Sequence, residues 1–369
     1  MAFKDTSATC VWTIPVDATT VDYLLVAGGG SGGSRHAGGG GAGGLLTASS
    51  VSLSGITSLN ITVGSGGASV IPSTYNYAPG LPGNNSVISK NAGAGTFTTV
   101  TAYGGGGGES GGAGAQSGGS GGGTQSATTS TGVAGQGNRG GIGGTNSSVW
   151  WSGGGGGAGA VGVDGSASSG GAGGAGAIWN SSFTTTVATA LGLAQTNQTS
   201  GNQVYFAGGG GGSISNSSSA GAGGLGGGGA GISGSNTATS GTANSGGGGG
   251  ASGCCNGGYS GAGGSGVAIF RYPANAGLVI SVSGSIVYRQ TTSISATANI
   301  NGKVTFYANR KVIPNCRNLV TSSRAVTCNW KPSIHGPISL TAEIASSTFP
   351  GYTGSARTSA ITAKRSNSR

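Results

Sequence analysis

The sequence has few of the side chains with which enzymes carry out acid–base and metal chemistry. Its 369 residues include six acidic residues, two histidines and one methionine. Charged residues make up 6% of the chain, against about 25% in ordinary proteins. The carboxylates are scattered rather than paired, and no Cys/His spacing fits zinc. We therefore expect a structural or binding protein rather than an enzyme, with no cofactor and no metal site.

Long apolar segments are also missing. No stretch approaches the roughly 18 apolar residues of a transmembrane helix, so we expect no membrane insertion. Residues 1–5 are not followed by an apolar run, which argues against a secretory signal peptide. The composition nevertheless suits an extracellular fibre. Assembly inside a cell followed by release on lysis, or secretion without an N-terminal signal, would reconcile these observations.

Glycine is what the chain has in excess. It supplies 87 residues, several times its usual share of about 7%. Because glycine costs about 1 kcal/mol at each helical position, a helical protein is excluded. The 9 prolines and the lack of a strict three-residue period exclude collagen.

The glycines recur in runs. Runs of five occupy residues 104–108, 153–157, 208–212 and 246–250. Such tracts form either a disordered linker or a bundle of polyproline-II-type glycine helices, whose backbone groups bond laterally because no side chain keeps them apart. Apolar groups such as Trp150-Trp151 are embedded between the tracts, and they favour the ordered bundle.

Short strands flank the tracts. Residues 10–15 and 21–26 are β-branched and aromatic-rich, with Pro15 and Asp17 supplying a turn between them. The alternation across 51–63 predicts a short strand pair.

Both ends of this region resemble a known domain. The pattern Trp12-Thr13-Ile14-Pro15, then Val21-Asp22-Tyr23-Leu24-Leu25-Val26-Ala27-Gly28-Gly29-Gly30, is similar to the opening of the glycine-rich domain common in bacteriophage tail-fibre and adhesin proteins. Residues 261–273 resemble its closing strand. The resemblance covers about residues 8–273 and implies an ordered polyglycine-II domain whose loops recognise a host surface. We place this domain at residues 1–273.

The remaining segment, 274–369, differs in charge. Residues 1–273 hold five bases and five acids, whereas residues 274–369 hold eleven bases and a single acid, Glu343. Such asymmetry marks a domain boundary. Strand patterns occur at 280–282, 286–288, 291–299, 304–308, 325–330 and 338–344, so we expect a β-sandwich. The fold class is therefore all-β and irregular: a polyglycine-II bundle with short flanking strands, followed by a sandwich.

This C-terminal segment resembles a bacterial Ig-like domain. The resemblance rests on Gly302-Lys303-Val304-Thr305-Phe306, on Cys316 and on Cys328-Asn329-Trp330. In that family a cysteine pair bridges neighbouring strands, which implies a Cys316–Cys328 disulfide. Adjacent Cys254 and Cys255 are either a vicinal disulfide or, as we favour, two small buried thiols.

Candidate binding residues fall into two sets. Aromatic rings supply contact area and stack on sugars. The receptor-binding candidates are therefore the aromatics that flank loops between tracts, with capping of the bundle as the alternative: Tyr75, Tyr77, Trp150, Trp151 and Tyr259. We expect Trp12 and Trp179 to cap the bundle, and His36 and His335 to be exposed loop residues.

The second set consists of bases in the C-terminal segment. Arg310, Lys311, Arg317 and Arg324 are candidates for binding an anionic surface. The same bases also fit the solvated face of a sandwich. Nucleic acid is the least favoured interpretation and is not expected as a partner.

The function that these expectations favour is that of a phage virion protein. We expect a tail fibre or receptor-binding adhesin that recognises host cell-surface glycans, assembles in the host cytoplasm and also contacts other virion proteins. A capsid fibre or decoration protein and a bacterial surface or matrix fibre are the alternatives. A homotrimer is possible, as is a bundle that closes within one chain.

Overall fold

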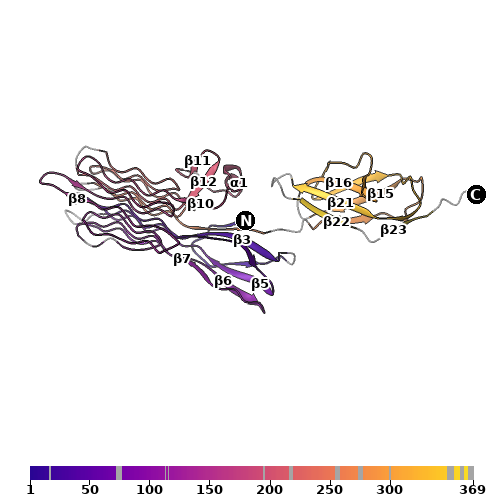
Figure 1. Ribbon diagram of the computed structural model, residues 1–369, viewed down its shortest axis with the longest axis horizontal. Helices are drawn as coiled ribbons and strands as arrows, with labels where there is room; N and C mark the ends of the chain where they lie inside the picture. Colours follow the sequence, from indigo (N-terminus) through magenta and orange to yellow (C-terminus); the bar gives the residue numbers. More distant parts are fainter. Residues whose placement is uncertain are drawn as a thin grey trace, which may run out of the picture. The chain divides into compact units, whose positions relative to one another are not determined.

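The chain divides into two compact units in a computed structural model. The first unit is Met1–Tyr272 and the second is Pro273–Arg369. The structure describes residues 1–15, 18–71, 77–112, 114, 116–193, 196–215, 219–253, 258–272, 277–298, 301–346, 353–357 and 361–364. Small antiparallel sheets and irregular segments make up most of it (Figure 1). No helix in the described part has the length and apolar character to cross a membrane.

The first unit contains thirteen short strands and one helix within the described ranges. Its elements are β1 (Ala2–Phe3), β2 (Cys10–Thr13), β3 (Thr20–Val26), β4 (Leu45–Ser52), β5 (Ile56–Thr62), β6 (Ser86–Gly93), β7 (Val100–Ala102), β8 (Gly144–Thr145), β9 (Trp150–Trp151), β10 (Ala177–Ile178), α1 (Thr185–Ala190), β11 (Thr199–Ser200), β12 (Gln203–Phe206) and β13 (Val267–Arg271).

Two four-stranded sheets anchor the first unit, in the orders β1-β13-β3-β4 and β2-β5-β6-β7. Strand β3 is buried on both faces because its side chains alternate between two cores. Tyr23 and Leu25 lie in the core that the two sheets share. Leu24 and Val26 lie in a second core, which includes residues of α1 and β12. This double burial explains the nearly continuous apolar sequence of β3.

The pairing of these strands corrects two expectations. Residues 51–63 do not form a strand pair, because β4 pairs with β3 whereas β5 pairs with β2 and β6. Trp12 does not cap the glycine tracts: it is 4% exposed and packs in the core between the two sheets. The alternation of apolar and polar residues correctly located the strands in the sequence. Which strands pair with each other was decided by contacts between segments that are far apart in the chain.

The glycine tracts run side by side beyond the ends of these strands (Figure 1). Their backbones are hydrogen-bonded from tract to tract. Gly40 N donates to Gly249 O over 2.8 Å, and Gly210 N donates to Gly40 O over 2.8 Å. Gly30 N donates to Gly41 O over 2.9 Å. The tracts are therefore ordered, and buried backbone groups find partners in other tracts, as buried polar groups must.

The tracts lie too close together to accept side chains. A Cβ built on Gly40, Gly155 or Gly210 would lie closer than 3.0 Å to a backbone oxygen of a neighbouring tract. Real Cβ atoms essentially never approach so closely, so these positions require glycine for space. Left-handed backbone is not what selects glycine here, because none of these three has a positive φ.

The second unit contains ten strands in its described part: β14 (Val279–Val282), β15 (Thr292–Thr297), β16 (Gly302–Ala308), β17 (Lys311–Val312), β18 (Leu319–Val320), β19 (Ala325–Trp330), β20 (Gly336–Ile338), β21 (Leu340–Ser346), β22 (Thr353–Arg357) and β23 (Ile361–Ala363). One sheet is β14-β15-β19, and another is β17-β16-β21-β22 with β18 beside β16. Both contribute side chains to one core, which includes Ile294 and Phe306. The strand expected at 286–288 is wrong, because this segment makes one isolated bridge.

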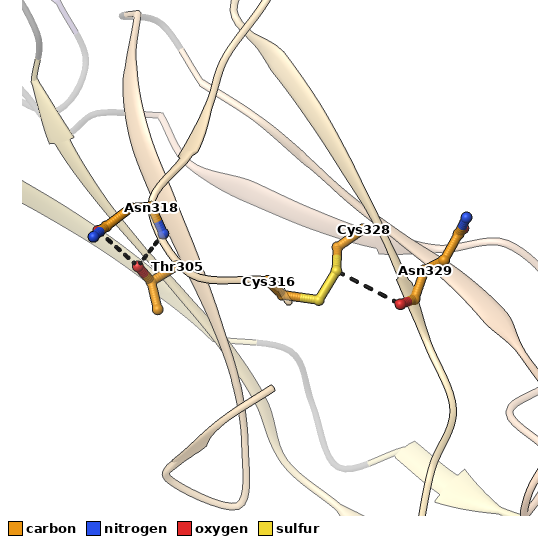
Figure 2. The surroundings of a disulfide bond; sticks show 5 residues. All are labelled: Thr305, Cys316, Asn318, Cys328 and Asn329. Atoms are coloured by element: carbon orange, nitrogen blue, oxygen red, sulfur yellow. Dashed lines mark hydrogen bonds between the residues drawn. A yellow bond between two sulfur atoms is a disulfide. The ribbon is translucent and has the colours of Figure 1, made fainter. Parts of the chain in front are cut away.

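Cys316 and Cys328 are joined by a disulfide (Figure 2). Their Cα atoms are 5.7 Å apart, and the two residues are 12 positions apart in the sequence. Cys328 lies in β19 and Cys316 in the connection between β17 and β18. The bond therefore links this connection to the other sheet, through the core that both sheets share.

Replacing Gly40 by alanine tests the close packing of the tracts. Its added methyl group would meet the carbonyl of Gly30, and the backbones would have to separate. We expect Gly40→Ala to lower the free energy of unfolding by about 2 kcal/mol or more, measured by chemical denaturation.

Gly114→Ala is the matched control, because nothing lies within 4 Å of a Cβ at that position and its φ is not positive. We expect a change within about 0.5 kcal/mol. Equal effects of the two substitutions would contradict the packing of the tracts described above.

The disulfide predicts a redox-dependent stability of the second unit. Closing a loop of this size stabilises a protein by about 2–3 kcal/mol, mainly by restricting the unfolded chain. A reducing agent should therefore lower the unfolding temperature of the second unit. In the Cys316→Ala/Cys328→Ala variant the reductant should have no further effect on the unfolding temperature of the second unit, and a further shift there would refute this account.

Candidate functional site

The far ends of the glycine tracts form the candidate site. Residues 27–33 lead away from β3, and residues 38–44 return to β4, so residues 34–37 make the turn between them. We call residues 34–37 the distal loop. Strand β8 lies at this far end of the unit, away from β3 and β5 (Figure 1).

Buried serine hydroxyls from the surrounding tracts hold the distal loop. Ser110 Oγ donates to Ser34 O over 2.6 Å, and Ser152 Oγ donates to His36 O over 3.0 Å. Ser213 Oγ accepts a hydrogen bond from Ala37 N at 2.8 Å. All four serines in these contacts are fully buried. The loop backbone is therefore fixed by several tracts at once.

A further serine connects the loop to the segment before Tyr259. Ser252 Oγ lies 2.9 Å from Ser34 Oγ, and both hydroxyls donate to Gly258 O. His36 N also donates to Gly253 O. These contacts place residues 258 and 259 beside the distal loop.

The middle of the loop adopts a left-handed conformation. Arg35 has φ 70° and His36 has φ 53°, which is uncommon for residues other than glycine. Such a conformation persists where the surroundings determine it, and here the buried serines do so. The two long side chains are thus presented in a fixed direction.

Each of these side chains lies against an aromatic ring. The Arg35 guanidinium is 4.7 Å from the centroid of the Tyr77 ring. The His36 ring is stacked on Trp150, with centroids 5.8 Å apart and an interplanar angle of 22°. Tyr77 and Trp150 remain 42% and 39% exposed, so each ring keeps area for a ligand.

His36 is half-buried, which corrects the expectation of an exposed loop residue. Burial, and secondly the charge of Arg35, hold the pKa of His36 below its ordinary value of 6.5. Its Nδ1 atom is buried and has no hydrogen-bond partner among the residues that the structure describes. The neutral form of His36 is therefore favoured near pH 7.

The structure brings together part of the predicted receptor-binding set. Tyr77, Trp150 and Tyr259, which is 43% exposed, all border the distal loop. Trp151 is half-buried and forms a bridge with Ile214, so it supports the site rather than lining its surface. Tyr75 lies outside the described residues, as do Cys254 and Cys255.

The predicted anionic-surface set is dispersed over the second unit, although all four bases are exposed. Arg310 lies in the turn between β16 and β17, and Lys311 is the first residue of β17. Arg324 lies beyond the opposite end of β16, where its N–H donates to Asn301 Oδ1. A strand of this length separates the two groups by roughly 20 Å. Arg317 follows Cys316, whose carbonyl bonds to Phe306 within β16.

The distal site is suited to binding. Aromatic faces beside a cation accept sugar rings and anionic substituents. Within the part of the chain that the structure describes, no cluster of three or more His, Cys, Asp or Glu side chains could hold a metal ion. Glu109 is buried close by, where it accepts hydrogen bonds from Ser126 Oγ at 2.9 Å and from Gln125 N at 3.0 Å.

Comparison with known families agrees with the architecture of the first unit. The family model described as "Glycine-rich domain" matches residues 5–273. This chain belongs to the glycine-rich domain family. No curated protein matches the sequence.

Sequence reasoning missed the residues that organise the site of this glycine-rich domain. Arg35 and His36 were not singled out for binding, and the serines were not considered. A signal for the serines exists: Ser152 precedes one five-glycine run and Ser213 follows another. At these positions the serine hydroxyls add side-chain hydrogen bonds to the backbone bonding between tracts, which continues in Ser152 N to Ser213 O over 3.1 Å.

The lowered pKa of His36 predicts how the glycine-rich domain responds to acid. The unfolded chain binds a proton at about the ordinary pKa, before the folded chain does. This contribution to stability is therefore complete above pH 6.5 and is lost as the pH falls toward the folded pKa. The wild type should lose more unfolding free energy than His36→Asn between about pH 7.5 and about pH 5. Identical pH profiles for the two proteins would rule out this role of His36.

Proposed function

We propose that the chain is a noncovalent binding protein of the phage tail-fibre or receptor-binding adhesin type. Its distal loop and the rings around it bind a glycan of the host cell surface, and the protein acts as part of a virion rather than as an enzyme. The observation that carries this proposal is the gathering of Tyr77, Trp150 and Tyr259 around the distal loop. These residues are separated by long stretches of sequence.

The proposal includes a finer description of the tracts, as a bundle of polyglycine-II helices. Bonding between tracts supports it, as at Gly155 N to Gly210 O over 2.8 Å. The mostly negative φ angles of the tract residues also support it, because polyproline II is a left-handed helix with φ near −75° and no internal hydrogen bonds. The bundle gives the binding loops a stiff base.

For the second unit the finer proposal is an Ig-like sandwich. Two sheets share one core and are linked by the Cys316–Cys328 disulfide, as an Ig-like domain would have them. Antiparallel pairing throughout the described strands also agrees with this assignment. Such a unit is suited to acting as a spacer or an additional binding module.

The exposed rings favour a sugar over a small charged ligand. Sugar rings present C–H groups that pack against aromatic faces, and hydroxyls that hydrogen-bond to polar groups at the rim. The side chains of Arg35 and His36, which are half-buried, supply polar groups beside the rings. Loops on a rigid scaffold are also where binding residues concentrate in proteins.

Truncation of the exposed rings tests the proposed function. The full-length protein should bind specific members of a panel of immobilised bacterial surface oligosaccharides. Tyr77→Ala/Trp150→Ala should weaken that binding at least about tenfold, because each exposed aromatic anchor contributes on the order of 1–2 kcal/mol.

Tyr103→Ala is the matched control, because Tyr103 is 45% exposed and directly precedes the tract 104–108 at the end next to β7. It should bind like the wild type. Absence of binding across the panel, or equal weakening by the control, would refute the proposal. Binding to empty capsids instead would favour the decoration-protein alternative.

A further inference from the structure

The second unit gathers bases at one end. We define the basic end as Arg289, Arg310, Lys311, Lys331 and Lys364, which are all exposed. They come from segments that are well separated in the sequence. Two of them, Arg310 and Lys311, were predicted to bind an anionic surface, whereas the other three are added by the structure.

Backbone hydrogen bonds place these segments together. Arg289 N donates to Pro332 O over 3.0 Å, beside Lys331. Tyr288 N donates to Lys364 O over 2.9 Å. The turn at Asn309 and Arg310, which leads into Lys311, is joined to Ser339, because Asn309 N donates to Ser339 O over 2.9 Å and Ser339 N donates to Asn309 Oδ1 over 2.8 Å. Ser339 follows β20, which pairs with β23 directly before Lys364.

No carboxylate side chain balances this end. The one acid of residues 274–369 is Glu343, which lies within β21 opposite Thr305, in the middle of β16. Glu343 accepts a hydrogen bond from Tyr307 Oη over 2.6 Å. Clustered bases without counter-charges raise the local concentration of anions and attract polyanions over distances of about a Debye length, near 10 Å at 0.1 M salt.

The aromatic groups at the basic end are already engaged. The Arg289 guanidinium lies 5.1 Å from the centroid of the Tyr288 ring, and the His335 ring meets Tyr288 edge-on at 5.8 Å. Tyr288 is half-buried. No helix is present in the described part of this unit to enter a DNA groove. Among the described residues of this end, Tyr288 is engaged by Arg289 and His335 and therefore offers little area for the stacking on unpaired bases on which single-stranded nucleic acid binding relies.

We propose that the basic end of the second unit binds an acidic polysaccharide through charge. The ligand class is a linear glycan with regularly spaced carboxylate or phosphate groups. This site is separate from the distal loop of the glycine-rich domain and does not depend on its function. It would give the protein a second, salt-sensitive attachment to an anionic cell surface.

The test uses the full-length protein and immobilised polygalacturonate, with neutral dextran as the reference surface. The variant Arg289→Gln/Lys331→Gln/Lys364→Gln removes three charges from the basic end. We expect its affinity for polygalacturonate at about 50 mM salt to fall at least about tenfold, and the salt dependence of its binding to become shallower.

The matched control, Lys303→Gln/Arg317→Gln/Arg324→Gln, removes the same charge from exposed positions along β16 and at its opposite end. It should retain affinity within about threefold. Equal losses in the two variants would show a net-charge effect and overturn the proposal, as would wild-type protein that does not bind polygalacturonate. Circular dichroism and unfolding temperature establish that both variants are folded.

Two further measurements separate the alternatives. Single- and double-stranded DNA of matched charge should bind more weakly than polygalacturonate, and tighter DNA binding that the basic-end variant abolishes would overturn the assignment in favour of nucleic acid. Tyr77→Ala/Trp150→Ala should bind polygalacturonate like the wild type, so failure of the distal-loop proposal leaves this result unaffected.

Discussion

Backbone hydrogen bonding between glycines of different tracts is the interaction on which the first unit depends. In a strand, a residue bonds to its sheet neighbours and its side chain forms the core. Within the tracts few side chains fill that role, so the N–H and C=O groups of residues such as Gly40 make the lateral contacts themselves. This arrangement offsets the large conformational entropy that glycine loses on ordering, because it satisfies the buried polar groups and packs backbone against backbone.

The same constraint explains where the functional side chains lie. Inside the tracts a Cβ would collide with a neighbouring backbone, so long side chains are confined to the ends. At the far end the tracts terminate in serines, whose hydroxyls fix the left-handed backbone of Arg35 and His36. Those two residues in turn hold Tyr77 and Trp150. The close packing of the glycine tracts therefore places the exposed aromatic rings at the far ends of the tracts, around the distal loop.

The two units are stabilised by different interactions. The first combines small apolar cores with an extended backbone network, whereas the second has one apolar core and a disulfide. Several bases of the second unit lie in or beside its turns, such as Arg289 and Arg310, and others lie on exposed strand positions, such as Lys303. The two proposed sites therefore lie on separate units and differ in chemistry.

The sequence by itself determined the composition-driven features: a chain of short strands and irregular tracts with almost no helix, and the change of charge after residue 273. These features are local, because the glycine content, the alternation of β-branched residues and the charge can each be read from neighbouring residues in the sequence. The tertiary structure decided which strands pair, that Trp12 is a core residue, and that Arg35 and His36 meet Tyr77 and Trp150. It also decided which bases lie at the basic end of the second unit: Arg289, Lys331 and Lys364 lie there with Arg310, whereas Arg324 lies at the opposite end of β16. These outcomes depend on contacts between residues that are distant in the sequence. The glycine tracts are nearly identical in sequence, so none of them carries a local signal that identifies the tracts beside which it will pack.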